Sequence, residues 1–301
     1  METFSESIIS PYQEMLHYET LWALPGMTES RISALFSDEG LPTNITENMD
    51  IKDKAAFEQL LPKTEAYLKN QAGFSVCLNG DFQYPRRLRD ARHPVNLFYY
   101  KGDLSLLSTP GISITGARSA SPEGLALARR LAIELTEENF TIISGLALGI
   151  DNASLESAIS AGGRVIGVIT TPVNGYFPSP LENNHLQDRI SKEHLLISQV
   201  PFFRYQHESF QSHRRHFPGI NATRSAISRA TVIVEADDKS TILTQAKAAL
   251  QQKRPLFIPD SCFENKDITW PAYYEKKGAV RVKSTQDILA YLQTGVKTNQ
   301  Q

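Results

Sequence analysis

The stretch from Gly111 to Asp151 constrains the fold of this chain more than any other part of its 301 residues. β-Branched apolar residues around Ile112 and Ile142 predict two short buried strands, and apolar residues between them repeat at the spacing of one helix face. Each strand leads through a turn of small residues, at 116–119 and 144–147, into a further helix. This order of elements is typical of a parallel sheet covered by helices.

The two small-residue turns are the strongest candidates for a binding site. In a parallel sheet they lie at the carboxyl ends of strands and open helices, whose unpaired N–H groups and positive dipole attract anions. We therefore predict that phosphate binds there. The candidate residues of this stretch are Gly116, Arg118, Ser119, Ser121, Ser144, Gly145 and Gly149.

Several of these residues also have structural interpretations. The guanidinium of Arg118 matches phosphate geometry and follows a strand end, which favours a ligand contact. Ser121 precedes Pro122, and this pair suits a helix N-cap and the first helical position. The glycines permit either a tight turn or the close approach of a ligand. Asp151 is interpreted as a helix N-cap rather than a general base, since no partner histidine or set of metal ligands accompanies it.

A basic segment supplies a second set of candidates. Between Arg204 and Arg229, five arginines stand against one acid, Glu208. A solvated loop is the alternative interpretation of this charge. The arginines taken as candidate phosphate contacts are Arg214, Arg215 and Arg224. Bases could stack on the neighbouring aromatic residues Phe202, Phe203 and Tyr205, although Phe202 and Phe203 are also interpreted as core.

The pattern divides the chain into three parts. Residues 1–68 are predicted to form a small helical domain, residues 69–295 the sheet region, and residues 296–301 a polar tail. In the helical part, Leu24-Pro25-Gly26 precedes a short amphipathic helix and resembles a helix-hairpin-helix or SAM-like module. Structural packing explains that turn as well as DNA contact does.

Strands and helices alternate from about 110 to 295, which predicts an α/β fold with helices on both faces of a parallel sheet. Among the expected elements are strands at 195–198 and 231–234, with the basic segment in a long loop between them. A helix is expected at 240–252. The arginines of 86–92 are interpreted as a solvated helix face rather than a basic rim.

Composition places the protein in an ordinary class. No run of apolar residues approaches the length of a membrane span, and the start of the chain lacks the apolar core of a secretion signal. Cys77 and Cys262 are too few and too far apart for a disulfide scaffold or a zinc site. A cytoplasmic location is expected. The formal charge of −2 gives no overall electrostatic argument for nucleic acid.

The sequence lacks the common catalytic signatures. It contains no GxxxxGK[ST], no GxGxxG after the first predicted strand and no GxSxG. The histidines show no metal-ligand spacing. We therefore expect no catalysis, no cofactor and no metal.

In order along the chain, a series of short motifs resembles the DNA-processing protein A (DprA/Smf) family. The resemblance covers about 80–290. The motifs are Tyr84-Pro85 with Leu88, LFYYKGDLSLL (97–107), ITGARSASPEG (114–124), IISGLALGID (142–151), GGRVIGVI (162–169), Phe217-Pro218 with Asn221, VIVEADDKSTILTQA (232–246), RPLFIPD (254–260) and GAVRVKSTQDIL (278–289).

The resemblance implies an extended Rossmann-like domain that binds single-stranded DNA cooperatively as a homodimer. It further implies a role in DNA uptake, recombination, natural transformation or defence, with DNA passed to a RecA-type recombinase and no nuclease activity. The DNA-phosphate pocket would include Arg118, Ser119, Ser144 and Gly145, with Asn221 on another wall. Ser240 lies in a matching strand-end loop.

The sequence departs from the family pattern at four places. Leu155 stands where the family has a histidine, and Ile220 and Ala222 stand where it has two arginines. Residues 240–243 read Ser-Thr-Ile-Leu in place of Ser-Gly-Ser/Thr-Leu. No winged-helix domain is expected after residue 295. We expect Arg214, Arg215 and Arg224 to replace the missing charge.

Two other functions remain open at this level. One is a nucleotide-binding sensor or nucleotide-processing enzyme of the related Rossmann-like superfamily, although the Pro-Gly-Gly-x-Gly-Thr turn of its phosphoribohydrolases is missing. The other is an interaction protein in which the pocket has lost its ligand. The dependence of binding on salt separates the first from a DNA groove, because only a groove that neutralises several phosphates loses affinity steeply.

Overall fold

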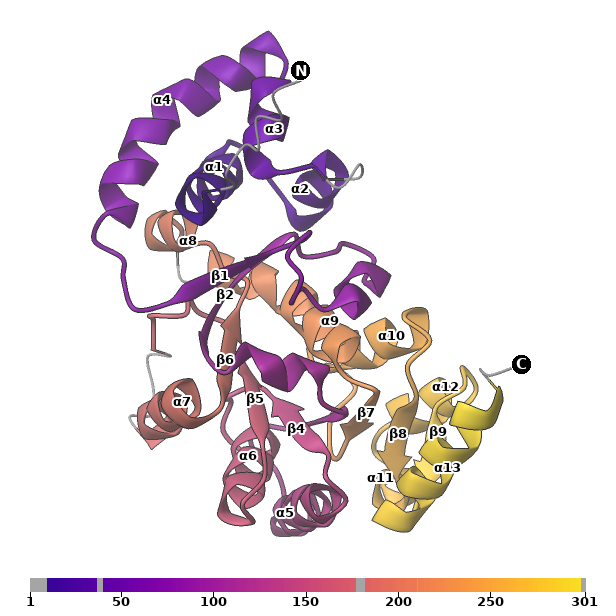
Figure 1. Ribbon diagram of the computed structural model, residues 1–301. Helices are drawn as coiled ribbons and strands as arrows, with labels where there is room; N and C mark the ends of the chain where they lie inside the picture. Colours follow the sequence, from indigo (N-terminus) through magenta and orange to yellow (C-terminus); the bar gives the residue numbers. More distant parts are fainter. Residues whose placement is uncertain (1–9, 37–39, 177–181, 210, 299–301) are drawn as a thin grey trace.

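The computed structural model of the protein describes residues 10–36, 40–176, 182–209 and 211–298 (Figure 1). Within those ranges, nine strands form one sheet. The strands are β1 (Ser75–Leu78), β2 (Leu97–Gly102), β3 (Gly111–Thr115), β4 (Thr141–Ser144), β5 (Val165–Val168), β6 (Leu195–Ser198), β7 (Ala230–Ile233), β8 (Leu256–Pro259) and β9 (Val280–Val282).

The strand order is β1-β2-β6-β5-β4-β3-β7-β8-β9. The seven strands from β6 to β9 pair in parallel, whereas β1 pairs antiparallel with β2 and β2 antiparallel with β6. The predicted α/β class is confirmed. The sheet is mixed rather than purely parallel, because residues 75–102 add a hairpin-like pair to its edge.

The order in which the chain adds strands to the sheet reverses at β3. From β3 it moves outward through β4, β5 and β6, and it then returns to place β7 on the other side of β3, where Thr115 pairs with Ile233. Ligands of open α/β sheets bind outside the carboxyl ends of the strands at such a switch point. The β3/β7 end is therefore the position at which the fold favours a site.

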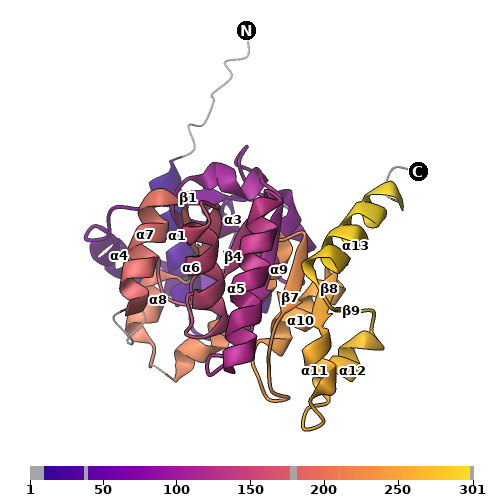
Figure 2. The ribbon, with the colours of Figure 1, turned by 90° about the horizontal axis from the view of Figure 1, so that it is seen from below.

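Helices cover both faces of the sheet (Figure 1). One face carries α5 (Pro122–Glu137), α6 (Ile150–Ser160) and α7 (Glu182–Glu193), and Figure 2 shows α5 and α6 side by side in front of the strands. The other face carries α9 (Phe217–Ile227) and α10 (Leu243–Gln251). Successive residues of a strand point to opposite faces, so Ile142 of β4 packs in the core under α5 and α6 while Ile143 packs with α9.

The last part of the chain closes the far edge of the sheet. It contains α11 (Asp260–Glu264), α12 (Trp270–Glu275) and α13 (Thr285–Thr298), and α13 packs on β9 and α5. Because α13 runs to Thr298, the first residues of the expected polar tail continue this helix. Residues 299–301 of that tail lie outside the described ranges.

In the described part of the chain, four helices precede the sheet: α1 (Pro11–Ala23), α2 (Glu29–Leu35), α3 (Pro42–Glu47) and α4 (Ile51–Leu68). Of these, α1 and α4 pack on α8 (Phe202–His207), and residues of these helices share one apolar core with the sheet. The buried carboxylate of Glu19 accepts hydrogen bonds from the backbone N–H groups of Phe202 (2.8 Å) and Phe203 (3.0 Å) and from the hydroxyl of Tyr99. The division into domains at residues 68 and 69 stays a prediction.

The long loop predicted for the basic segment is wrong. The described residues of this segment form α8, the 3₁₀ helix η3 (Ser212–His216) and α9. Charged residues at 204, 208, 214 and 215 mask the helical spacing of the apolar residues, and the segment becomes helical because Ile220 and Ile227 pack against the sheet. The helix expected at 240–252 begins only at Leu243, after a turn in which Ser240 N–H bonds to the carbonyl of Asp237.

Candidate functional site

The candidate site lies at the carboxyl ends of β3 and β7. The backbone N–H of Ala117 donates to the carbonyl of Glu235 (2.7 Å), which ties the loop after β3 to the end of β7. Gly149, at the start of α6, has a φ of 81°, and a Cβ there would lie 2.3 Å from the carbonyl oxygen of Ala117. Glycine is therefore required where α6 approaches this loop. A Cβ at Gly116 would likewise lie 2.8 Å from the Glu235 carbonyl oxygen.

Four of the predicted contact residues face the surface. Arg118 and Ser119 are exposed in the loop after β3, and Arg214 and Arg215 are exposed on η3. The guanidinium carbon of Arg118 lies 6.0 Å from the ring centroid of Phe217, the first residue of α9. The structure therefore brings the β3 loop and the basic segment, distant in sequence, to one edge of the sheet.

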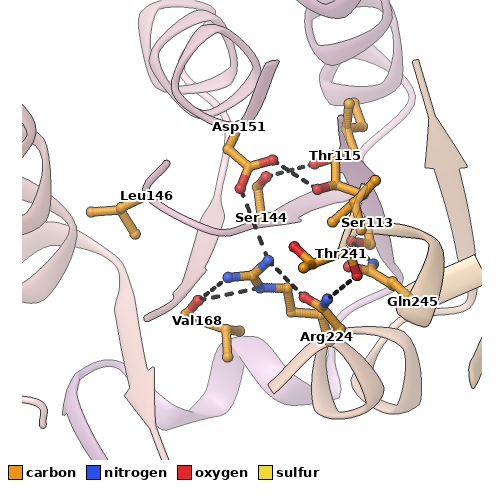
Figure 3. Close-up of polar contacts among 12 residues, drawn as sticks. Ser113, Thr115, Ser144, Leu146, Asp151, Val168, Arg224, Thr241 and Gln245 are labelled. Carbon is orange, nitrogen blue, oxygen red and sulfur yellow. Dashed lines mark hydrogen bonds and ion pairs between the residues drawn. The ribbon is translucent and has the colours of Figure 1, made fainter. Parts of the chain in front are cut away.

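Arg224 is buried under this surface (Figure 3). Its Nε and Nη2 donate to the carbonyl of Val168 (3.2 and 2.8 Å), and its Nη1 donates to Oδ1 of Asn221 (3.2 Å). The same Nη1 lies 3.9 Å from Oδ2 of Asp151. With only 5% of its surface exposed, Arg224 joins α9 to β5 and α6. The carboxamide of Asn221 is similarly held, donating to the carbonyl of Thr241.

Asp151 is not a helix N-cap, so that prediction is wrong. The N-cap of α6 is Gly149, and the carboxylate of Asp151 turns inward, where its Oδ1 accepts a hydrogen bond from the hydroxyl of Thr115 (2.8 Å). Burial raises its pKa, while the neighbouring charge of Arg224 lowers it. The sequence carries no local signal for the pairing of Asp151 with Arg224, because these two residues lie on α6 and α9, which are far apart along the chain.

Two further candidates support this network from below. The hydroxyl of Ser144 is fully buried and donates to the carbonyl of Ile114 (2.5 Å). A Cβ at Gly145 would lie 2.4 Å from Nη2 of Arg224 and 2.5 Å from Oδ2 of Asp151. Ser144 and Gly145 are both buried, so they shape the site and do not reach its surface.

The start of α5 is occupied by a carboxylate of the protein itself. Ser121 is the N-cap, as predicted, since its hydroxyl accepts from the N–H of Gly124 (3.0 Å) and Pro122 follows it. Its own N–H and hydroxyl donate to the carboxylate of Glu235 (3.1 and 2.7 Å). The sequence analysis did not identify this role of Glu235, because its partner Ser121 lies more than a hundred residues away in the chain. Ser240, half-buried, accepts a long hydrogen bond from the N–H of Ile242 (3.4 Å).

A cavity of about 730 Å³ lies beside the start of α5. Its polar lining comes from the loop after β3, the end of β7 and the region of α11. The lining side chains with polar groups include Ser119, Ser121, Arg130, Glu235, Ser261 and Asn265. The volume is in the range of small-molecule sites.

The aromatic residues beside the basic segment do not form a stacking surface. Phe202 and Phe203 are 1% and 8% exposed, so their interpretation as core is confirmed. Tyr205 is half-buried, and its ring stacks on His213 with 3.6 Å between the ring centroids. No group of three or more potential metal ligands occurs in the described residues, and no helix among them is long and apolar enough to cross a membrane.

A doubly wound sheet with exposed arginines beside its switch point defines a Rossmann-like protein with a basic edge. The model of the family described as DNA recombination-mediator protein A matches residues 75–293. The chain belongs to this family, which includes the proteins called DprA and Smf.

Relatives match across most of their length. The DNA processing protein DprA of Bacillus subtilis is 32% identical over 243 residues, which cover 79% of each protein. The DprA of Streptococcus pneumoniae is 32% identical over 69% of this chain and 70% of its own. The solved structure of the pneumococcal protein superposes with a TM-score of 0.76 at 27% identity, covering 94% of this chain and 98% of that one. A Helicobacter pylori structure of DNA processing protein A shares the fold, with a TM-score of 0.61 at 24% identity over 75% of this chain and 96% of that one.

Proposed function

We propose that this protein binds single-stranded DNA without catalysing a reaction on it. The observation that carries the proposal is the placement of the exposed Arg118 beside Phe217 at the switch point of the sheet. The loop after β3 adds Ser119 to the same edge, and the 3₁₀ helix η3 adds Arg214 and Arg215. Arginine forks bind phosphate oxygens well, and phosphate contacts give binding that tolerates any base sequence.

The relatives support the nature of the ligand. Those of Bacillus subtilis and Streptococcus pneumoniae are named DNA processing proteins, and the Helicobacter pylori structure is described as showing a single-stranded DNA binding mode. In our proposal the exposed residues Arg118, Ser119, Arg214 and Arg215 contact phosphates. The remaining predicted site residues shape the loops beneath them: Gly116, Ser121, Ser144, Gly145, Gly149, Asn221, Arg224 and Ser240.

The setting of this function is part of the proposal. The protein acts in the cytoplasm as a homodimer in DNA uptake, recombination or defence, and hands single strands to a RecA-type recombinase. The family membership supports this setting. Analytical ultracentrifugation tests the dimer, and strand exchange by a RecA-type recombinase on single strands coated with a single-strand-binding protein tests the transfer.

A nucleotide-binding site is the second candidate, and the cavity of about 730 Å³ beside Ser119 favours it. Glu235 opposes it, because its carboxylate occupies the helix start at which a nucleotide phosphate would bind. Equilibrium binding of labelled thirty-nucleotide poly-dT and of a labelled mononucleotide, each across a salt series, separates the two. Steep loss of poly-dT affinity with salt supports the DNA site, whereas tight and salt-insensitive mononucleotide binding contradicts it.

A further inference from the structure

We propose that the N-terminal helices hold the basic edge of the DNA site in place through Arg204 and Glu208, which act as positioning residues. The inference rests on the proposed function. Figure 1 shows α1 next to α8, and a chain of polar contacts runs from the N-terminal helices through α8 to η3. Neither side chain reaches the surface far enough to hold DNA, since Arg204 is 11% and Glu208 13% exposed.

Arg204 is the anchor on the N-terminal side. Its Nη1 donates to the carbonyls of Trp22 (3.0 Å) and Met27 (2.8 Å), at the end of α1 and in the turn before α2. Its guanidinium carbon also lies 5.3 Å from the ring centroid of Trp22. Because Nη1 binds both carbonyls while Nε binds Glu208, the contacts use two separate nitrogens of the planar guanidinium, which a lysine ammonium does not have. The Arg204 charge is therefore committed to the N-terminal helices.

Glu208 links Arg204 to the basic segment through contacts with Arg215 and His216. One carboxylate oxygen bonds to Nε of Arg204 and lies 3.3 Å from Nη1 of Arg215, and the other lies 3.4 Å from Nε2 of His216. Burial raises the pKa of Glu208, but the hydrogen bond and charge of Arg204 outweigh this effect and bring it below its ordinary value. Burial lowers the pKa of His216 to about 4, so this imidazole is neutral near pH 7. Arg215 is thus the exposed cation that Glu208 orients.

The oriented residue stands next to the proposed DNA site. Arg215 lies two residues before Phe217 in the chain, and the ring of Phe217 faces Arg118. A second contact fixes the same region. Glu29 of α2 packs against Gly219 of α9, and a Cβ on Gly219 would lie only 2.0 Å from a Glu29 carboxylate oxygen. The N-terminal helices therefore define where η3 and α9 begin relative to the loop after β3.

The variant Glu208→Gln separates positioning from charge, because the two effects have opposite signs. Removing an acid beside a polyanion site strengthens DNA binding by electrostatics alone. Loss of the Arg215 orientation weakens it. We expect the affinity of Glu208→Gln for labelled poly-dT to fall about threefold to tenfold, equivalent to roughly 0.6–1.4 kcal/mol. The slope of log affinity against log salt should fall by about 0.7 if one phosphate contact is lost. If Glu208→Gln only lowered stability, its folded molecules would bind DNA with the same dependence on salt as the wild type.

Two further variants make the test decisive. Asp237→Asn removes an exposed acid near Ser119 that does not touch the basic segment, and it should bind DNA slightly more tightly. Arg204→Lys keeps the charge and loses the fork, so it should weaken binding as Glu208→Gln does. Unchanged or tighter binding by both Glu208→Gln and Arg204→Lys, with wild-type protein binding normally, overturns the inference. Failure of wild-type protein to bind poly-dT overturns the proposed function instead.

Discussion

The carboxylate of Glu235 sits on the N-terminus of α5, where it accepts hydrogen bonds from both the backbone N–H and the hydroxyl of Ser121. A Cβ at Gly124 would lie 2.2 Å from the same carboxylate. The anion at this helix start is therefore a carboxylate of the protein itself. In our proposal, DNA phosphates therefore bind farther out, along Arg118 and Ser119.

Removal of this internal anion should open a phosphate site. In Glu235→Ala the N–H and hydroxyl of Ser121 lose their acceptor, which should cost about 1–2 kcal/mol of unfolding free energy. Inorganic phosphate should then raise the melting temperature of the variant and leave that of wild-type protein nearly unchanged. Asp237→Ala, which removes an acid from the same cavity without touching α5, is the control. An equal phosphate effect in wild type, Glu235→Ala and Asp237→Ala would show that Glu235 blocks nothing.

Loss of Arg224 should be severe. Arg224→Met leaves the buried carboxylate of Asp151 without its ion pair and the carbonyl of Val168 without its donor. We expect the unfolding free energy to fall by about 3–5 kcal/mol, measured by urea denaturation at neutral pH. The double variant Arg224→Met with Asp151→Asn should recover part of this loss, since it removes the unpaired charge. Equal stability of the single variant and the wild type would contradict the buried role of Arg224.

The partly buried Glu29 should make stability depend on pH. Burial raises its pKa from 4.5 to about 7, and its Oε1 has no hydrogen-bond partner in the described residues. The native state therefore holds this proton more tightly than the unfolded chain does, so the destabilising effect of the charge develops as the pH rises from 4.5 to 7.

Replacement by glutamine removes this effect. Relative to wild type, Glu29→Gln should gain about 1–3 kcal/mol of unfolding free energy between pH 5 and pH 8 in urea titrations. Glu156→Gln, which changes an exposed residue of α6, should show no such pH-dependent difference. A Glu29→Gln curve parallel to that of the wild type would mean that the carboxylate is solvated.

Much of the sheet could be predicted because its strands are short, apolar and bounded by small-residue turns. The strand expected at 195–198 is observed without change, and the unit from 111 to 151 has the expected order of elements. The antiparallel edge strands were harder to assign, since pairing direction depends on where β1 and β2 meet β6. The helical character of 202–227 was missed because arginines interrupt its apolar face.

The meeting of the two loops could be predicted from the sequence, whereas the burial and partners of their side chains could not. The small-residue turns after β3 and β4 do meet at the switch point, because parallel strands share one carboxyl edge. Whether an arginine there is buried depends on partners far away in sequence. In the sequence, Arg118 and Arg224 both look like surface arginines. In the structure Arg224 is buried, where it donates to the carbonyl of Val168 and lies beside the carboxylate of Asp151.

The central claim is tested most directly by fluorescence anisotropy of labelled thirty-nucleotide poly-dT and of an equally long duplex, for wild type and Arg118→Ala across a salt series. Arg164→Ala is the matched control, because Arg164 is an exposed arginine at the opposite, amino-terminal edge of the sheet, before β5. We predict preferential single-strand binding, about tenfold weaker in Arg118→Ala with a salt slope smaller by about 0.7, and little change in Arg164→Ala. No single-strand binding at low salt, or equal losses in the two variants, would contradict a DNA site at the β3/β7 edge.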